Sequence, residues 1–96
     1  MADHPLARGI GLLGRRRLEP DEGLLITRTS AITMLFMLFA IDAVFVDRER
    51  RVVKVASRLR PWTPAVAARG ADAVLELPAG TAERSGTQVG DVLRLG

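Results

Sequence analysis

Glycines and prolines break this chain of 96 residues at ten places between residues 14 and 90, which leaves little room for long helices. Several of the segments between the breaks are rich in β-branched and aliphatic side chains. Short strands at close spacing, separated by turn residues, are typical of small all-β proteins. The frequent glycines and prolines, with β-rich segments between them, therefore predict a mostly β chain.

The most apolar stretch, TMLFMLFAIDAVFVD at residues 33–47, is interrupted by one carboxylate, Asp42. A membrane-spanning helix needs about 20 mainly apolar residues. The longest uninterrupted apolar piece here is the eight residues from Met34 to Ile41. We therefore expect a core strand rather than a membrane anchor, in a soluble protein that purifies without detergent.

Two β-rich runs, IDAVFV and RVVKVA, flank a polar turn at residues 48–51 and predict an antiparallel hairpin. The first run is apolar on both faces, as a central strand covered on two sides should be. The second run alternates, so one of its faces should meet water. Its inward residues should be Val53, Val55 and Leu59, and its outward residues Lys54, Ala56, Arg58 and Arg60.

The segments LLIT at residues 24–27 and DVLRL at residues 91–95 predict two further strands. GTAERSG predicts one short helical turn, with Thr81 as a possible N-cap and Gly86 as a possible residue just past the helix end. In DAVLEL, the alternation places Glu76 outward, and Pro78 ends the strand because proline has no N–H to donate. The inward residues of DAVLEL should be Ala73, Leu75 and Leu77.

Four stretches carry a resemblance: ARGIGLLGRRRLEPDEGLLI, the run that ends in IDAVFVD, then LRPW, and finally AVLELPAGTAERSGTQVGDVLRL. Together they resemble a small prokaryotic family known as domain of unknown function 192, over about residues 7 to 95. The resemblance implies a small single-domain antiparallel β-sandwich or jelly-roll-like barrel over residues 1–96, with one or two short helices. It implies no established activity. We expect an ordered core over about residues 7–95 and a flexible N-terminus at 1–5.

The chain departs from the family pattern inside the apolar stretch, where relatives tend to have polar residues and a proline. If those polar groups line a pocket in relatives, the pocket of this chain is more apolar or absent. The departures are Thr33, Met34, Leu38 and Ala40.

Composition restricts the chemistry, because the chain has no cysteine and His4 is its one histidine. A zinc site would have to consist of carboxylates, so we expect no metal and no cofactor. The glycines at 9, 11 and 14 lack the spacing of a phosphate-binding loop, which favours turns and close packing. The cysteine-free composition and the lack of a visible secretory signal predict a cytoplasmic protein.

Asp42 should be buried, and an unpaired buried carboxylate is costly. It is either a structural acceptor for backbone N–H groups or an arginine, which we favour, or a functional group, namely the polar anchor of a ligand pocket or a general acid or base. We expect an arginine partner, with Arg15 the first choice and Arg58 or Arg60 the second, because ladder donors are already engaged. Arg15 could instead contact an anionic ligand. The candidate ligand or structural site is therefore Asp42, Arg15 and Trp62.

Basic residues gather in one segment, since residues 47–60 hold six basic groups against two acidic ones while the whole chain has a net charge of +3. Lys54, Arg58 and Arg60 lead to Trp62, and arginines beside a stacking ring are one way to grip single-stranded nucleic acid. The basic face around residues 48–62 is therefore a candidate RNA site. The alternative is a sheet edge protected by charge.

Three function classes remain open: a domain that binds a small molecule or a protein, which we favour, an RNA-binding domain, and an enzyme of unknown class. A deep pocket containing Asp42 would indicate the first, and a contiguous basic stripe with an exposed Trp62 the second. A second titratable group beside Asp42 would indicate the third. No membrane partner is expected.

Overall fold

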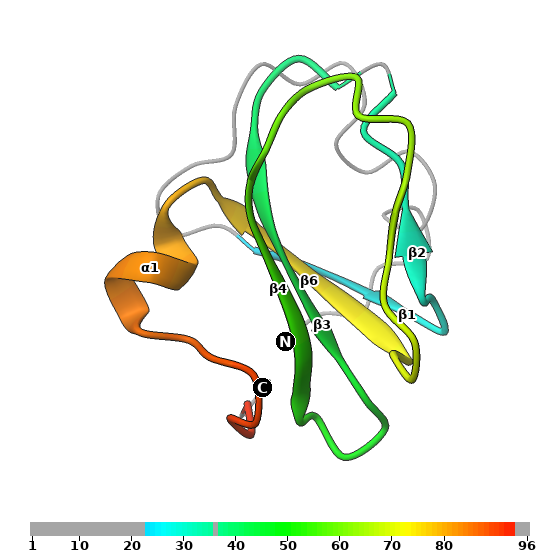
Figure 1. The fold of residues 1–96 in the computed structure, drawn as a ribbon, viewed down its shortest axis with the longest axis vertical. Coiled ribbons are helices and arrows are strands. Elements are labelled where there is room, and N and C mark those ends of the chain that lie inside the picture. Colours follow the sequence, from blue (N-terminus) through cyan, green and yellow to red (C-terminus); the bar gives the residue numbers. More distant parts are fainter. Residues whose placement is uncertain (1–22, 36, 94–96) are drawn as a thin grey trace.

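The computed structural model describes residues 23–35 and 37–93, which form β-strands and one short helix (Figure 1). The mostly β architecture predicted from the sequence is confirmed. The N-terminus expected to be flexible and the glycines at 9, 11 and 14 lie outside the described residues. In chain order the elements are β1 (Leu24–Thr27), β2 (Ala31–Ile32), β3 (Ile41–Val46), β4 (Val52–Leu59), β5 (Val66–Ala67), β6 (Ala73–Pro78) and α1 (Thr81–Ser85).

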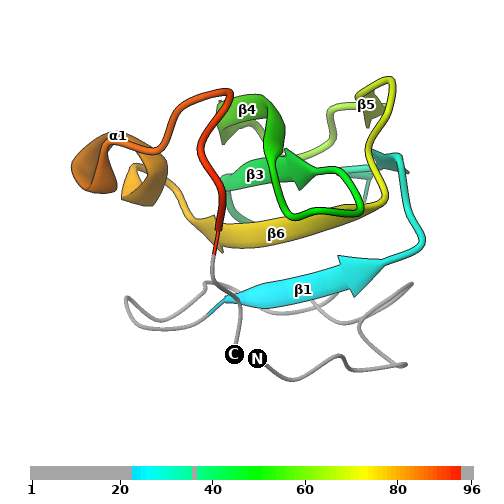
Figure 2. The same cartoon turned by 90° about the horizontal axis from the view of Figure 1, so that it is seen from below.

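The main sheet has four antiparallel strands in the order β1-β6-β3-β4, and β2 pairs with β5 in a second, two-stranded sheet. The view from below shows β6 between β1 and β3 (Figure 2). β3 is a central strand whose residues are all buried, and it forms a hairpin with β4. Both predictions for this region are confirmed.

The main sheet is covered on both faces (Figure 1). On one side, which we call the loop face, Phe45 packs in a cluster with Met34, Met37 and residues of β2 and β5. On the other side, the helix face, Val44 and other sheet residues pack against Ala82 of α1. The arrangement confirms the predicted sandwich-like class, with open sheets rather than a closed barrel.

The alternation predicted for β4 is interrupted by two register shifts against β3. Val53 and Leu59 pack against the loop-face cluster, whereas Val55 packs against the helix-face cluster. The prediction that these three residues share one inward face is therefore wrong. A bulge inserts an unpaired residue and reverses the side to which the following side chains point.

The predicted strand in DAVLEL is confirmed as β6, but the outward orientation of Glu76 is wrong, because this residue is 7% exposed. β6 lies between β1 and β3, so both of its alternating sets of side chains are covered. Ala73 and Leu75 belong to the helix-face cluster, and Glu76 points to the loop face with Val74.

The short helix α1 ends as predicted at Gly86, which has a left-handed φ of 70°. Its start differs from the prediction, because Gly80 with φ 93° occupies the N-cap position and no side-chain cap comes from Thr81. The expected strand after Gly90 is reduced, within the described residues, to a bridge between Arg51 and Val92. In residues 23–35 and 37–93, no helix is long and apolar enough to cross a membrane.

Candidate functional site

Asp42 lies on the helix face of β3 with no exposed surface, and its two carboxylate oxygens accept hydrogen bonds from two backbone amides. The N–H of Arg58 donates to Oδ1 at 2.8 Å, and the N–H of Ala82 donates to Oδ2 at 2.8 Å. Asp42 therefore joins the central strand to β4 and to the first turn of α1. Its predicted burial is confirmed.

The two donors are amides that regular pairing leaves unused. Arg58 lies at the register shift opposite Asp42 and has a φ of 52°, so its N–H is directed at the carboxylate rather than along the ladder. Ala82 is in the first turn of α1, where backbone N–H groups have no partner within the helix. A carboxylate is also favourable at this end of a helix. Asp42 supplies the cap that Thr81 does not.

The expectation that Arg58 would bind Asp42 through its guanidinium is wrong, because the contact uses the main chain. The guanidinium of Arg58 instead contacts Glu83 of α1 at 3.3 Å. Arg15, our first choice, lies outside the described residues. Within the described part of the chain, the arrangement around Asp42 is that of the structural acceptor which we considered as one alternative.

Glu76 is a second buried carboxylate, which sequence reasoning placed in solvent. Leu24 and Ala43 lie opposite Glu76 on the neighbouring strands. No described residue forms a hydrogen bond or an ion pair with the Glu76 carboxylate. Burial raises the pKa of Glu76 to about 7. The apolar residue Val74, on the same side of the strand, was the sequence signal that this side is also covered.

The two buried carboxylates do not form a catalytic pair. Ala43 is the β3 partner of Glu76, and Asp42 is the next residue, so the two side chains point to opposite faces of the sheet. The second titratable group that would indicate an enzyme is therefore separated from Asp42 by the sheet itself. Among the residues that the structure describes, no group of three or more His, Cys, Asp or Glu side chains could hold a metal ion.

Lys54, Arg58 and Arg60 are all exposed, as predicted, but they do not form one row. Lys54 lies opposite Phe45 on the loop-face side and donates to the carbonyl of Ala67 at 2.9 Å, whereas Arg58 reaches Glu83 of α1 on the other side. β4 is an edge strand of the main sheet. Charges on both sides of this edge agree with the alternative that they protect it from pairing with another chain.

Trp62 lies in a tight turn after β4 and has a φ of 70°. Pro61 precedes it, and the N–H of Thr63 donates to the carbonyl of Arg60 at 3.3 Å, which are features of a type II turn. The position that Trp62 occupies normally holds glycine, because a side chain is strained there. Strain of this kind concentrates at functional sites.

Backbone hydrogen bonds attach this turn to the connection between β2 and β3. The N–H of Trp62 donates to the carbonyl of Met34 at 2.7 Å, and the N–H of Met34 donates to the carbonyl of Thr63 at 2.9 Å. Met34 and Met37 point inward, whereas Leu35 and Leu38 point outward. The strained turn is thus held against a second loop whose inner side is part of the core.

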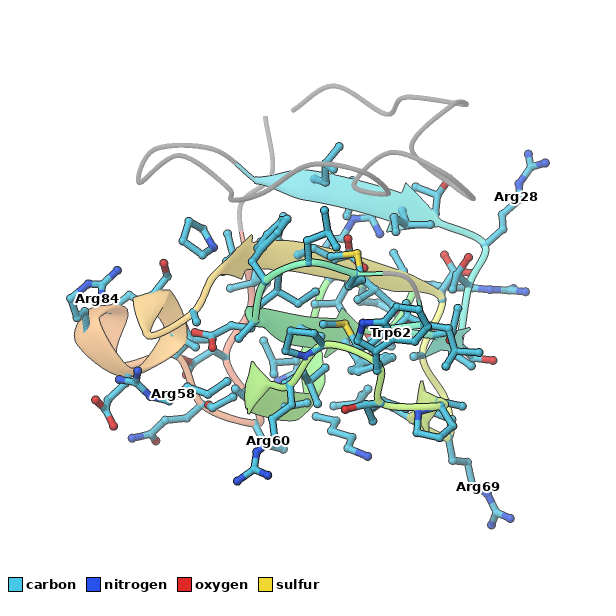
Figure 3. The ribbon with its side chains drawn as sticks, turned by 90° about the horizontal axis from the view of Figure 1, so that it is seen from above. Arg28, Arg58, Arg60, Trp62, Arg69 and Arg84 are labelled. Carbon is cyan, nitrogen blue, oxygen red and sulfur yellow. The ribbon has the colours of Figure 1, made fainter. Side chains whose placement is uncertain are left out.

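The exposed apolar side chains of these two loops form what we call the Trp62 surface, consisting of Leu35, Leu38 and Trp62. Their exposed fractions are 38%, 49% and 53%. Figure 3 shows that the Arg60 side chain points away from the Trp62 ring. The three side chains that define the Trp62 surface are apolar, and Arg60, two residues before Trp62, is directed away from it. Sequence reasoning identified Trp62 but assigned the two leucines to the apolar stretch.

Known proteins are similar to this chain in sequence and in fold. The family DUF192, described as Uncharacterized ACR, matches residues 1–95. A UPF0127 protein of Pyrococcus abyssi is 36% identical over 97 residues, covering 95% of this chain and 80% of that protein. A UPF0127 protein of Thermococcus sibiricus is 41% identical over 66 residues, which are 68% of this chain and only 42% of that protein.

Two crystal structures have the same fold at 30% sequence identity. A protein of unknown function from Novosphingobium aromaticivorans has a TM-score of 0.82, covering 94% of this chain and 67% of that one. A Sinorhizobium meliloti protein, described as a candidate transcription regulator, has a TM-score of 0.84, covering 97% of this chain and 77% of that one.

Proposed function

Since the chain belongs to the uncharacterised family DUF192, we propose that it is a small binding domain that docks a protein partner on the Trp62 surface. The observation that carries the proposal is the exposed tryptophan in a strained turn position. A non-glycine residue at positive φ is strained, and strain of this kind concentrates at functional sites, so an exposed aromatic side chain at such a position supports a role in contact with another molecule. The cytoplasmic location expected from the composition stays a prediction within this proposal.

The chemistry of the surface favours a protein over a small molecule. Small-molecule sites are concave and bury most of the ligand, whereas Leu38 and Trp62 each have about half of their surface exposed. Tryptophan is enriched among the residues that dominate protein–protein binding energy. Arg60 is exposed and lies two residues before Trp62, so a complementary partner would carry an apolar centre with an acidic residue at its rim.

Site-specific photocrosslinking in the cell tests the proposal. A photoreactive phenylalanine analogue at position 38 should give an adduct with one partner, and adding Trp62→Ser should abolish it. The same analogue at Val89, which is also exposed, serves as the matched control and should give no such adduct. With the purified partner, Trp62→Ser should weaken binding about 30-fold, the equivalent of about 2 kcal/mol for a central aromatic contact.

Two outcomes would contradict the proposal. An adduct from position 38 that survives Trp62→Ser would mean that the tryptophan is not an anchor. Adducts formed only between copies of this chain would mean that the surface is a self-association site rather than a docking site for another protein.

RNA binding is the second candidate, because the exposed Trp62 ring lies near basic residues and one structural relative is described as a candidate transcription regulator. The division of these residues between the two sides of β4 weakens it. Changing Lys54, Arg58 and Arg60 together to glutamine should leave the fold intact, as measured by circular dichroism, because all three side chains are exposed. If the parent binds RNA with a salt-dependent affinity that this variant loses, RNA binding becomes the better proposal.

The conformation of residue 62 can be tested separately from its binding role. Trp62→Gly and Trp62→Ala both lose the ring, but alanine keeps the cost of a side chain at positive φ. We expect the glycine variant to be more stable than the alanine variant by about 1 kcal/mol in urea unfolding, although glycine is usually the less stable of the two. Equal stabilities, or a more stable alanine variant, would show that the turn is not strained.

A further inference from the structure

We propose that protonation of Glu76 controls the Trp62 surface: the neutral side chain lets the β2–β3 connection stay packed on the loop face, and the ionised side chain loosens it. This inference rests on the proposed function, because it describes regulation of the same surface.

Glu76 lies near the end of the sheet where the β2–β3 connection returns to it. Its strand ends at Pro78, which pairs with Ile41, and Ile41 is the first residue after the connection. Glu76 itself pairs with the residue two positions farther along β3, Ala43. Its side chain points to the loop face, the same face on which Met34 and Met37 are buried.

Among residues 23–35 and 37–93, no group forms a hydrogen bond or an ion pair with the Glu76 carboxylate that would neutralise its charge. The cross-strand neighbours are Leu24 and Ala43, and the described members of the loop-face cluster are uncharged. Lys54, on β4, lies at the margin of this face, but its ammonium group donates to a backbone carbonyl of β5. Among the other described charged residues in the connections, Arg28 after β1 and Arg69 after β5 are exposed, and Asp72 contacts Arg48 at 3.9 Å. An ionised Glu76 therefore needs water.

Of the described segments on this face, the β2–β3 connection is the one that we expect to move and admit water. The strands are held by continuous ladders, whereas the connection is held by Met34, Met37 and a few backbone hydrogen bonds. Two of those bonds join Met34 to the Trp62 turn. Movement of Met34 would therefore displace Leu35 and release the strained turn. Leu35 and Trp62 would then move apart, and the Trp62 surface would be disrupted. Partner binding should be weaker above the pH at which Glu76 ionises.

Trp62 is the one tryptophan of the chain, so its fluorescence reports on the turn directly and without a partner. In the parent protein we expect the emission and its quenching by acrylamide to change with pH around a midpoint of about 7, with stronger quenching at high pH. Glu76→Gln should abolish this transition and keep the low-pH spectrum throughout. Glu76→Leu serves as a second neutral variant with the same expected result.

Two controls separate Glu76 from other titrating groups. His4→Gln removes the only histidine, whose ordinary pKa of about 6.5 falls in the same range, and should leave the transition unchanged. Glu83→Gln removes an exposed carboxylate and should also leave it unchanged. A transition that persists in Glu76→Gln, or its absence in the parent, would overturn the inference. If the fluorescence transition is present but no partner binds at any pH, only the proposed function is overturned.

Discussion

Replacing Asp42 with alanine should lower the free energy of unfolding by about 3 to 5 kcal/mol, because two backbone amides lose a charged acceptor at once. The Ala82 amide is buried and the Arg58 amide is partly buried, so water cannot fully replace the carboxylate. Each hydrogen bond to a charged group contributes about 1.5 to 3 kcal/mol. Urea unfolding monitored by circular dichroism measures the loss.

Two control variants identify the mechanism. Asp42→Asn keeps one carbonyl oxygen but turns an amide group toward the other N–H, so it should lie between the parent and Asp42→Ala. Arg58→Ala removes the guanidinium but keeps the backbone donor, so its effect should add to that of Asp42→Ala. Strong coupling between the two changes, or a nearly neutral Asp42→Ala, would contradict the backbone role.

Replacing Glu76 with glutamine should stabilise the protein at neutral and alkaline pH and remove a pH dependence. The pKa of Glu76 is about 7 in the folded protein against 4.5 for the ordinary group. Below about pH 4.5, both folded and unfolded chains hold the proton, so the carboxyl has no effect on the pH dependence. Between pH 4.5 and 7 the unfolded chain releases it while the folded protein keeps it, and stability falls by about 1.4 kcal/mol per pH unit.

Above about pH 7 the loss is complete and amounts to about 3 kcal/mol. Glu76→Gln should therefore match the parent near pH 4 and exceed its stability by up to about 3 kcal/mol at pH 8. Thermal unfolding of both proteins across this pH range measures the difference in their stability. The contributions of other titrating groups are the same in both proteins and cancel in that difference. Glu83→Gln, which changes an exposed carboxylate, is the matched control and should track the parent. A constant difference between Glu76→Gln and the parent at all pH values would contradict the buried titration.

The strands were predictable because turn residues and alternation are local signals. The hairpin of β3 and β4, the central position of β3 and the end of α1 at Gly86 could all be derived from them. Alternation separates the two faces of a strand, but it does not say whether one or both faces are covered. This is why Glu76 was placed in solvent: Leu75 and Leu77 mark one buried side, and the position of β6 between two strands buries the other.

Backbone N–H groups were one of the predicted alternatives for Asp42, but the two amides that bind it could not be identified, because both depend on irregularities. The burial of Asp42 follows from its apolar neighbours, but the free amide of Arg58 depends on a register shift between two strands. The free amide of Ala82 depends on where a five-residue helix begins and on its packing against β3. Neither the shift nor the contact leaves a repeating pattern in the sequence, and in a regular ladder, where the amides are paired, an arginine side chain would be the expected partner.

The link from Asp42 to Ala82 also has a consequence for the order of folding. A helix of five residues is too short to form on its own, and its buried cap comes from a residue 40 positions earlier in the chain. α1 therefore forms after β3 has found its place in the sheet, as a late step with no independent stability. The Ala82 amide should then exchange with solvent whenever α1 detaches from the sheet, and therefore sooner than the amides of the central strand β3, which should need the whole domain to unfold.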